Sequence, residues 1–313
     1  MIDDQISGVL QPFRDDDVVI IPNPGNAGDS FITCATYQML DDLGIRYRVG
    51  SPLATYPGAV VVYAGGGNLI GAYTNAIDFI QRNHRLVKAL IVLPHTIDAF
   101  DDVLAELGDN CTIFCREQRS FDHVSSCVTQ ARVFMAHDMA LGADLQRIRA
   151  NVKALNATSM GIPRFNREDV RLTLIAYRHM VRSGGRFEIL SAFRTDVEKT
   201  DVDIPPHNFD VSAIFATRDL SPEACARTTV RMMAFLDRYA CIRTNRLHVC
   251  ILSLMLGKRV EFYPNSYYKN EAIYEHSLRS RFPLLIWKGR AKEAGTDGGN
   301  TRGLPDWLSP HDA

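Results

Sequence analysis

The sequence predicts an α/β protein built from two doubly wound domains that face each other across a cleft. Its first half alternates short, continuous apolar runs, such as 18–21 and 59–63, with helical patterns. Runs that are apolar at every position and separated by helices are typical of parallel strands covered on both faces. The second half repeats this style, and 313 residues are enough for two ordinary domains with hydrophobic cores of their own.

The individual elements follow from hydrophobic spacing and from turn residues. Phe31, Cys34 and Met39 share one helical face. Asp29 stands where an N-cap is expected, and Gly257 stands where a helix should end. We expect strands over 18–21, 46–49, 59–63, 89–93, 111–115, 186–192, 239–242 and 259–263. We expect helices over 30–43, 75–85, 172–181, 227–238 and 247–256, and a turn over 64–68.

The least regular segment, 142–169, is expected to carry the crossover between the two domains. We therefore divide the chain into an N-terminal domain over 1–145, a C-terminal domain over 146–290 and a tail over 291–313. The tail is rich in Gly, Asp and Pro, which indicates a loosely ordered terminus.

Composition excludes several classes of function. The formal net charge is −1, so the protein lacks the general basic field that nucleic-acid binding needs, and no nucleic-acid partner is expected. The acidic N-terminus is unlike a secretory signal, and the longest apolar run, 249–256, is too short to span a bilayer. The seven scattered cysteines complete no zinc set, so we expect free thiols in a reducing cytosol and no metal.

Two polar, glycine-containing turns in the first half are candidate binding loops. Asn26 and Asp29 lie between a strand and a helix, where glycines let the backbone approach a ligand. Asp29 argues against bare phosphate there, and it could instead bind a sugar hydroxyl or cap the helix; a purely structural turn is the equal alternative. Gly66, Gly67 and Asn68 could form a backbone N–H cradle, or simply a tight bend.

Basic residues follow two expected strands. Arg116 stands at the carboxyl end of 111–115, where α/β proteins bind ligands, and its guanidinium suits a carboxylate or phosphate. A surface ion pair with Glu117 or Asp122 is the alternative. Arg246 and His248 flank Leu247 at a helix start, an arrangement suited to an anionic substrate that needs proton transfer.

Other polar residues are weaker candidates. Lys269 is expected in a solvated loop after the last strand, and Arg194, Asp196 and Glu198 are interpreted as either an ion-pair network or part of a site.

Taken together, these motifs resemble the polysaccharide pyruvyltransferase family, and the chain's size suggests the exopolysaccharide ketal-pyruvate transferase branch. The resemblance runs from about residue 18 to about residue 278. Its most specific carrier is Arg246-Leu247-His248. The other carriers are residues 25–29 and 65–68, Arg116 with Ser120, Asp138, residues 194–198, Gly257-Lys258 and the Tyr268-Lys269 region. The segment 93–95 departs from the family pattern, so His95 is given no role.

The resemblance implies a fold and a site. The fold would be two Rossmann-like domains in a GT-B-like arrangement. The donor would be phosphoenolpyruvate, a co-substrate, with no cofactor and no metal. Arg246, Leu247 and His248 would line the donor site in the C-terminal domain, with Arg116 opposite them in the N-terminal, acceptor-side domain. We assign the role of general acid or base to His248, because an imidazole can exchange protons near neutral pH. Asn26, Asp29, Gly66, Gly67, Asn68 and Lys269 would line the cleft or bind the acceptor.

The implied reaction moves the enolpyruvyl unit onto a sugar of a polysaccharide repeat unit, forming a pyruvate ketal and releasing phosphate. The acceptor would be a lipid-linked oligosaccharide, so we expect a cytoplasmic protein that works at the inner face of the cytoplasmic membrane and touches it only peripherally. Two alternatives stay open on the same fold: a GT-B glycosyltransferase that uses a nucleotide-sugar, and a non-catalytic carbohydrate-binding protein.

Overall fold

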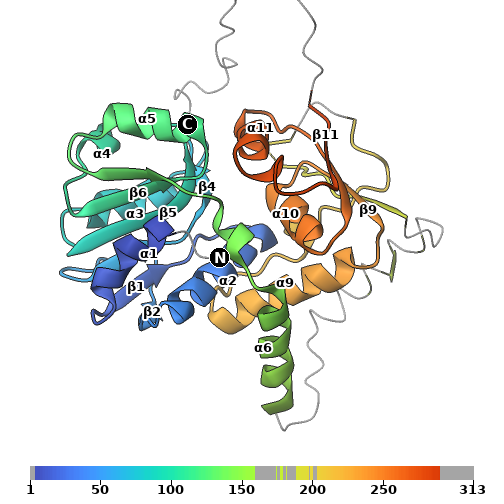
Figure 1. The fold of residues 1–313 in the computed structure, drawn as a ribbon, viewed down its shortest axis with the longest axis horizontal. Helices are drawn as coiled ribbons and strands as arrows, with labels where there is room; N and C mark the ends of the chain where they lie inside the picture. Colours follow the sequence, from blue (N-terminus) through green and yellow to red (C-terminus); the bar gives the residue numbers. More distant parts are fainter. Residues whose placement is uncertain are drawn as a thin grey trace, which may run out of the picture.

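The structure is a computed structural model that describes residues 4–158, 188–196, 198–199 and 203–289, with positions 174, 177, 178 and 181. The tail expected over 291–313 and most of the helix expected over 172–181 lie outside these residues. Figure 1 shows two α/β halves, each with a sheet of its own.

The first half contains a seven-stranded parallel sheet with the order β2-β1-β3-β5-β6-β7, in which β4 also pairs with β5. Its strands are β1 (Val18–Ile21), β2 (Tyr47–Val49), β3 (Val60–Tyr63), β4 (Gly66–Leu69), β5 (Ala89–Ile97), β6 (Cys111–Cys115) and β7 (Arg132–Met135). Every residue of β1, β3, β5 and β6 is buried, as their continuous apolar sequences predict.

Helices cover both faces of this sheet. Alternate residues of β1 belong to different cores: Val18 and Ile20 to one, Val19 and Ile21 to the other. The first core lies under α1 (Asp4–Leu10) and α2 (Ala27–Asp42). The second lies under α3 (Asn75–Asn83), α4 (Asp101–Ala105) and α5 (Gln118–Cys127). The doubly wound arrangement predicted for this half is therefore present.

The second half contains a four-stranded parallel sheet with the order β11-β10-β9-β8. Its strands are β8 (Ile189–Ser191), β9 (Cys241–Thr244), β10 (Arg259–Phe262) and β11 (Leu285–Trp287). The described helices around it are α6 (Leu145–Thr158), α8 (Val211–Ile214), α9 (Pro222–Leu236), α10 (Leu247–Met255) and α11 (Lys269–Ile273). Gly257 follows α10 with φ of 74°, a left-handed conformation that ends the helix as predicted.

Three local expectations were wrong. Gly66–Leu69 forms β4 rather than a turn, because β5 continues past Pro94 to Ile97 and supplies a partner edge. The register of β5 shifts between Val92 and His95, since Pro94 cannot donate a ladder hydrogen bond. The segment expected to be irregular opens instead with a regular helix, α6. Asn26, not Asp29, is the N-cap of α2.

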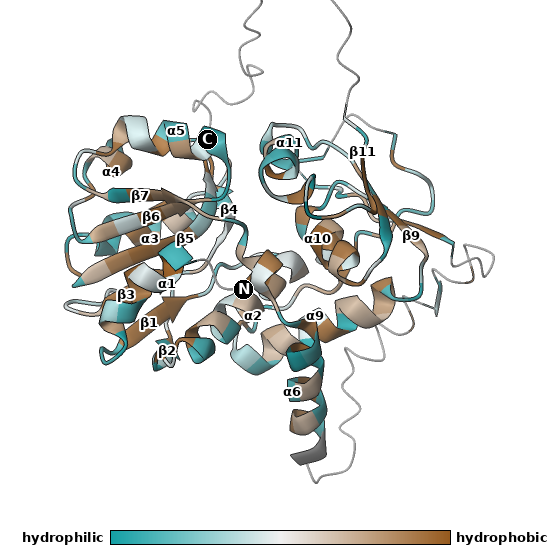
Figure 2. Ribbon diagram, viewed as in Figure 1, coloured by the Kyte–Doolittle hydropathy of each residue, from teal (hydrophilic) through white to brown (hydrophobic). Residues whose placement is uncertain are grey.

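The hydrophobic core joins the two halves. One continuous cluster includes Ile20 and Phe31 from the first half and Met233 and Ile251 from the second. Helix α2 packs against α9 at this junction (Figure 1). In Figure 2 the strands of both sheets are largely coloured as hydrophobic, and the helices mix hydrophobic and hydrophilic residues. The domain boundary near residue 145 stays a prediction. Among the described residues, no helix is long and apolar enough to cross a membrane.

Candidate functional site

A cavity of about 160 Å³ lies between the two halves, at the carboxyl ends of strands from both sheets. Ligands of α/β proteins bind at this edge because the loops that leave parallel strands converge there. The loops after β1, β6, β9 and β10 contribute Asn26, Arg116, Arg246 and Lys269. The lining is Asn23, Pro24, Gly25, Asn26, Asp29, Gly67, Asn68, Tyr73, Asn75, Arg116, Arg194, Asp196, Glu198, Ser212, Arg246, Leu247, His248 and Lys269.

The structure thus brings together every site residue that the sequence singled out except Gly66. Gly66 lies behind the wall, where an added Cβ would be 2.1 Å from Nδ2 of Asn23. Gly67 lines the cavity, and a Cβ there would be 2.5 Å from Nη2 of Arg116. A Cβ at either position would therefore displace a neighbouring side chain, and the absence of one at Gly67 lets the backbone approach the guanidinium.

The start of α2 is held by a capping box. Oδ1 of Asn26 accepts a hydrogen bond from the amide of Gly28 at 2.8 Å, and Oδ2 of Asp29 accepts one from the amide of Asn26 at 2.7 Å. Asp29 is thus the N3 residue of the capping box and not the N-cap that the sequence predicted. Burial raises the pKa of Asp29, and His248, the Asn26 amide, Arg116 and Lys269 oppose that rise.

Asn68 connects the cavity wall to a buried histidine. Its side-chain amide donates to Oδ1 of Asn75 at 3.2 Å, and its Oδ1 lies 3.0 Å from Nε2 of His95. The other ring nitrogen of His95 lies 3.0 Å from the carbonyl oxygen of Leu93. Burial lowers the pKa of His95 to about 3, so this imidazole is neutral and fixes the position of Asn68.

Arg116 is buried, and its side chain is only 1% exposed. Nη1 donates to Oδ2 of Asp138 at 2.7 Å, and Nε donates to the hydroxyl of Thr96 at 2.9 Å. The alternative of a surface ion pair with Glu117 or Asp122 was wrong, because the partner is a buried carboxylate from the next strand loop. Nη2, beside Gly67, is the part of the guanidinium directed to the cavity wall.

Asp138 also contacts His248. Its Oδ2, which accepts from Arg116, lies 3.3 Å from Nε2 of His248. Burial would raise the pKa of Asp138, but His248, Arg116 and the Ala140 amide together hold it well below its usual range. Asp138 is therefore an ionised carboxylate shared by the two predicted site residues, one from each half of the chain.

Arg246 is already paired on all sides. Nε and Nη2 donate to the two carboxylate oxygens of Asp210, at 3.0 and 2.5 Å, and Nη1 lies 2.9 Å from Oδ2 of Asp196. The Asp196 side chain is 39% exposed, whereas that of Asp210 is 8% exposed. An anion that binds Arg246 must therefore displace Asp196, the more exposed of the two partners.

A second ion-pair network lies beside the first. Oε2 of Glu198 accepts from Nη1 of Arg194 and from Nζ of Lys269, both at 2.5 Å, and its Oε1 accepts from the Tyr73 hydroxyl at 3.0 Å. The sequence left open whether residues 194–198 form ion pairs or a site, and the structure shows ion pairs that also line the cavity. The solvated loop expected for Lys269 was wrong, because this residue is 7% exposed.

The pKa values of Lys269 and of Glu198 are both lowered. Burial lowers the pKa of Lys269 to about 8, with Glu198 opposing that change and Arg194 and Arg116 adding to it. The pKa of Glu198 falls to about 2, because Lys269 and Arg194 outweigh the effect of burial. A buried ammonium with a lowered pKa beside two guanidinium groups can bind an anion and change charge near neutral pH.

Sequence reasoning assigned no contact to two carboxylates that organise these cations. Asp138, which follows β7, was named among the residues that carry the family resemblance, but no partner was predicted for it. Asp210 had no signal, because it contacts Arg246 across 36 residues of chain. Each carboxylate that lines the cavity is already held by a cation or an amide: Asp29, Asp196 and Glu198. A metal at this position would have to displace those groups.

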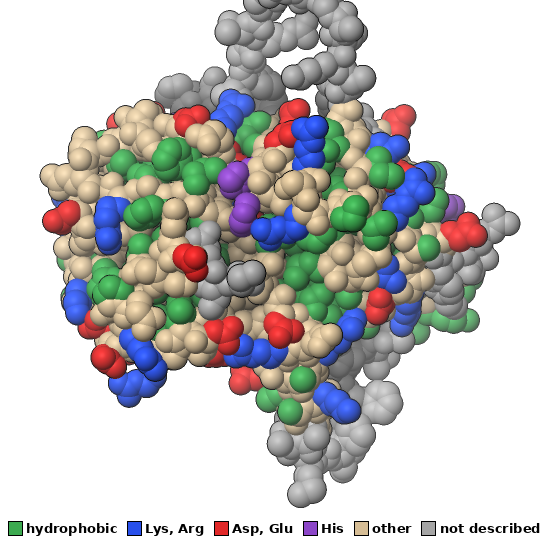
Figure 3. All heavy atoms as spheres, in the orientation of Figure 1, with side chains coloured by type: hydrophobic (Ala, Val, Ile, Leu, Met, Phe, Trp, Pro, Cys, Tyr) green, Lys and Arg blue, Asp and Glu red, His purple; other side chains and the backbone are tan. Residues whose placement is uncertain are grey.

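A larger cavity of about 290 Å³ is lined by Asp138 and by residues of α1, α2 and the loop after β7. Its lining includes Asp42, Asp144, apolar side chains and one arginine, Arg281. It therefore lacks a cluster of cationic side chains that could bind an anion. On the face drawn in Figure 3, basic and acidic side chains are interspersed rather than gathered in a patch of one sign. The smaller cavity is therefore the better candidate site.

The chain is an α/β protein with two parallel sheets. Between its two halves lies a polar cavity lined by arginines, a lysine and a histidine. The sequence model of the polysaccharide pyruvyl transferase family matches residues 26–267. The chain belongs to this family, whose activity is pyruvyl transfer to polysaccharide. A solved structure, of a functionally uncharacterized protein from Klebsiella pneumoniae, is similar with 30% sequence identity and a TM-score of 0.71, and the match covers 90% of this chain and 96% of that one. No curated protein matches the chain.

Proposed function

We propose that this protein transfers the enolpyruvyl unit of phosphoenolpyruvate to a sugar of a polysaccharide repeat unit, forming a pyruvate ketal and releasing phosphate. The observation that carries the proposal is the buried group of Arg116, Arg194, Arg246 and Lys269 around one cavity with His248. Phosphoenolpyruvate carries a carboxylate and a phosphate, and cations placed around both groups would orient the enol for attack. Family membership supports the pyruvyl part of the proposal.

The two cations best placed to bind the donor are Arg116 and Lys269. Arg116 bonds to Asp138 and Thr96 through Nη1 and Nε, so its Nη2 takes part in neither bond. Nζ of Lys269 bonds to Glu198. Arg246 would join them once the donor displaces Asp196, so it contributes both to binding and to the position of the loop. A guanidinium fork suits a carboxylate or a phosphate, whereas an ammonium acts as a point charge.

The reaction needs one proton at C3 of the donor and removes one from each of two sugar hydroxyls. Protonation of C3 leaves a cationic centre at C2, which the first hydroxyl attacks with loss of its proton. The second hydroxyl then displaces phosphate and closes the ketal ring. His248 would move protons in these steps. Because ionised Asp138 can only accept, Nε2 of His248 carries a proton toward it, and Nδ1 is the nitrogen left for exchange.

The acceptor side of the cavity would be formed by Asn26, Asp29 and Asn68. Their amide and carboxyl groups, together with the backbone at Gly67, suit sugar hydroxyls better than anions. We propose a lipid-linked oligosaccharide as the acceptor, met at the inner face of the cytoplasmic membrane. We also propose that the two parallel sheets belong to two domains in a GT-B-like arrangement, which the contribution of both halves to one cavity supports.

A thermal-shift titration tests the donor. Phosphoenolpyruvate, UDP and UDP-glucose are each titrated against the wild-type chain, Lys269→Met and the exposed control Arg85→Met. A ligand bound only by the folded state stabilises it by about 2.7 kcal/mol at a hundredfold excess over its dissociation constant. We expect a shift with phosphoenolpyruvate that Lys269→Met weakens and Arg85→Met keeps. A shift with the uridine nucleotides alone would replace the proposal by a nucleotide-sugar glycosyltransferase.

A further inference from the structure

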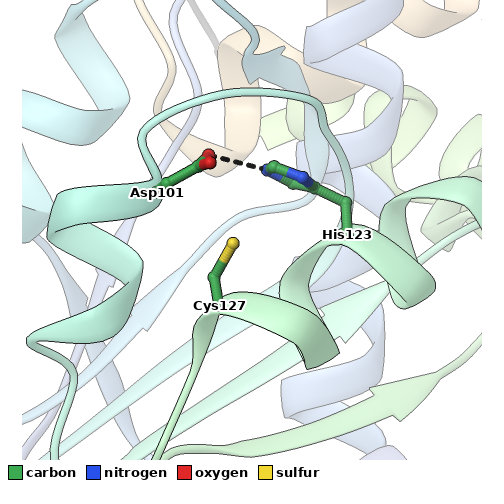
Figure 4. Close-up of side chains that lie close together, drawn as sticks. All are labelled: Asp101, His123 and Cys127. Carbon is green, nitrogen blue, oxygen red and sulfur yellow. Dashed lines mark ion pairs between the residues drawn. The ribbon is translucent and has the colours of Figure 1, made fainter.

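A second group of reactive side chains lies away from the cavity, between α4 and α5. Asp101 is the first residue of α4, and His123 and Cys127 lie one turn apart on α5 (Figure 4). One possible ligand atom from each residue lies within 4.8 Å of the other two, and Nε2 of His123 is 3.3 Å from Oδ1 of Asp101. The spacing of four residues puts the imidazole and the thiol on one face of α5.

These three donors are of the kinds that bind zinc. An imidazole nitrogen, a thiolate and a carboxylate oxygen are its usual protein ligands, at about 2.0 to 2.3 Å from the ion. In a tetrahedral site these lengths place the ligand atoms about 3.5 Å apart. The pair of His123 and Asp101 already has this spacing. The side chains of His123 and Asp101 are 24% and 69% exposed, so they can adjust to the ion without disturbing the core.

Two observations separate this group from an ordinary surface ion pair. Nε2 of His123 is shielded from solvent, and its 3.3 Å contact with Oδ1 of Asp101 does not have the geometry of a hydrogen bond. A shielded ring nitrogen that makes no hydrogen bond is costly, and a metal ion placed between it and the carboxylate would bind both groups. In addition, Cys127 is the one cysteine of the seven that is not buried. The half-buried thiol and the imidazole whose Nε2 makes no hydrogen bond therefore occur at the same place.

We propose that Asp101, His123 and Cys127 bind a divalent transition metal ion, Zn²⁺ by preference, with water completing the coordination. The thiolate and the imidazole select a borderline-soft ion and disfavour Mg²⁺ and Ca²⁺, which take oxygen ligands. The ion would join the start of α4 to the second half of α5. Helix α5 begins two residues after Arg116, so the metal would stabilise the helix that leaves the candidate active site.

Spectroscopy with Co²⁺ tests the site directly. Tag-free, full-length protein is kept reduced and titrated with Co²⁺ alone, and then with Zn²⁺ as competitor. We expect a thiolate-to-cobalt charge-transfer band that Zn²⁺ displaces. Cys127→Ser should abolish the band, and His123→Ala should weaken Zn²⁺ binding by at least about tenfold. The matched control is Asp102→Asn, a neighbouring exposed carboxyl on α4, which should bind Zn²⁺ like the wild type.

Thiol reactivity gives a second readout that does not depend on folding of a variant. In the native protein a disulfide reagent should react rapidly with a single thiol, Cys127, and Zn²⁺ should slow that reaction while Mg²⁺ should not. Wild-type protein without a charge-transfer band and without protection by Zn²⁺ would overturn the proposal. Zn²⁺ binding that survives in both Cys127→Ser and His123→Ala would overturn it too. Either outcome leaves the proposed pyruvyl transfer unaffected.

Discussion

Nε2 of His248 lies 3.3 Å from Oδ2 of Asp138, the same oxygen that accepts a hydrogen bond from Nη1 of Arg116 at 2.7 Å. One ionised carboxylate thus positions a cation from the first half of the chain and an imidazole from the second. This arrangement fixes the orientation of the His248 ring.

His248→Ala should therefore impair turnover more than donor binding. Positioned general acids and bases contribute roughly 10²- to 10⁴-fold to rate, so we expect a loss of turnover in that range. The dissociation constant for phosphoenolpyruvate should change far less. Stopped-flow and steady-state kinetics, with titration calorimetry for the donor, measure both quantities. Turnover equal to that of the wild type would remove His248 from the mechanism.

Asp138→Ala should destabilise the fold strongly. The substitution leaves the Arg116 guanidinium buried without its counter-ion, and breaking a buried pair in this way costs about 3 to 5 kcal/mol. Urea unfolding measures the change. The control is Asp17→Ala, which removes an exposed partner of Arg48 and should cost at most about 1 kcal/mol. Equal effects of the two substitutions would contradict the buried-pair interpretation.

Gly28→Ala should displace His248. An added Cβ would lie 2.8 Å from Cβ and 2.9 Å from Nδ1 of His248, and 2.9 Å from Oδ1 of Asn26, closer than real contacts allow. We expect reduced turnover together with a weakened capping box. Gly71→Ala is the matched control, because nothing lies within 4 Å of a Cβ there. Crystallography of the variant should show the imidazole moved, and an unmoved ring with full activity would refute the prediction.

Donor affinity should fall as the pH rises through about 8. Burial lowers the pKa of Lys269 to about 8, so the ammonium that would attract phosphoenolpyruvate is lost above that pH. Calorimetric titrations across pH 6.5 to 9.5, a range set around that pKa, measure this fall in donor affinity. In Lys269→Met the donor should bind more weakly and without this pH dependence. An affinity in the wild type that stays constant across the range would show that Lys269 does not act through its charge.

The same pKa shift has a consequence for stability. Between pH 8 and the pKa of an unfolded lysine, about 10.4, the unfolded chain binds a proton that folded Lys269 lacks. The contribution of Lys269 to the free energy of unfolding therefore rises with pH in this window. Between pH 8 and pH 10, the free energy of unfolding measured with urea should rise more with pH in the wild type than in Lys269→Met. A larger rise in Lys269→Met would contradict the sign of this shift.

The sequence alone determined most of the sheet framework and most of the residues around the cavity. Continuous apolar runs such as Val18–Ile21 are typical of buried strands, and side chains that follow such strands meet at one sheet edge. Arg116 and Arg246 were found in this way. The loop assigned to Lys269 was wrong, because local polarity does not report which half of the chain will cover a residue.

Only the tertiary structure decided which charges meet. Asp138 contacts His248 across 110 residues, and Asp210 contacts Arg246 across 36. Such pairs leave no periodic trace in the sequence, because a single carboxylate on a loop looks the same whether it faces water or a buried guanidinium. The strand β4 was missed for a similar reason: Gly66–Leu69 has little strand propensity, and its conformation depends on the edge that β5 offers. Local patterns determine the elements, whereas burial and partners depend on how distant elements pack.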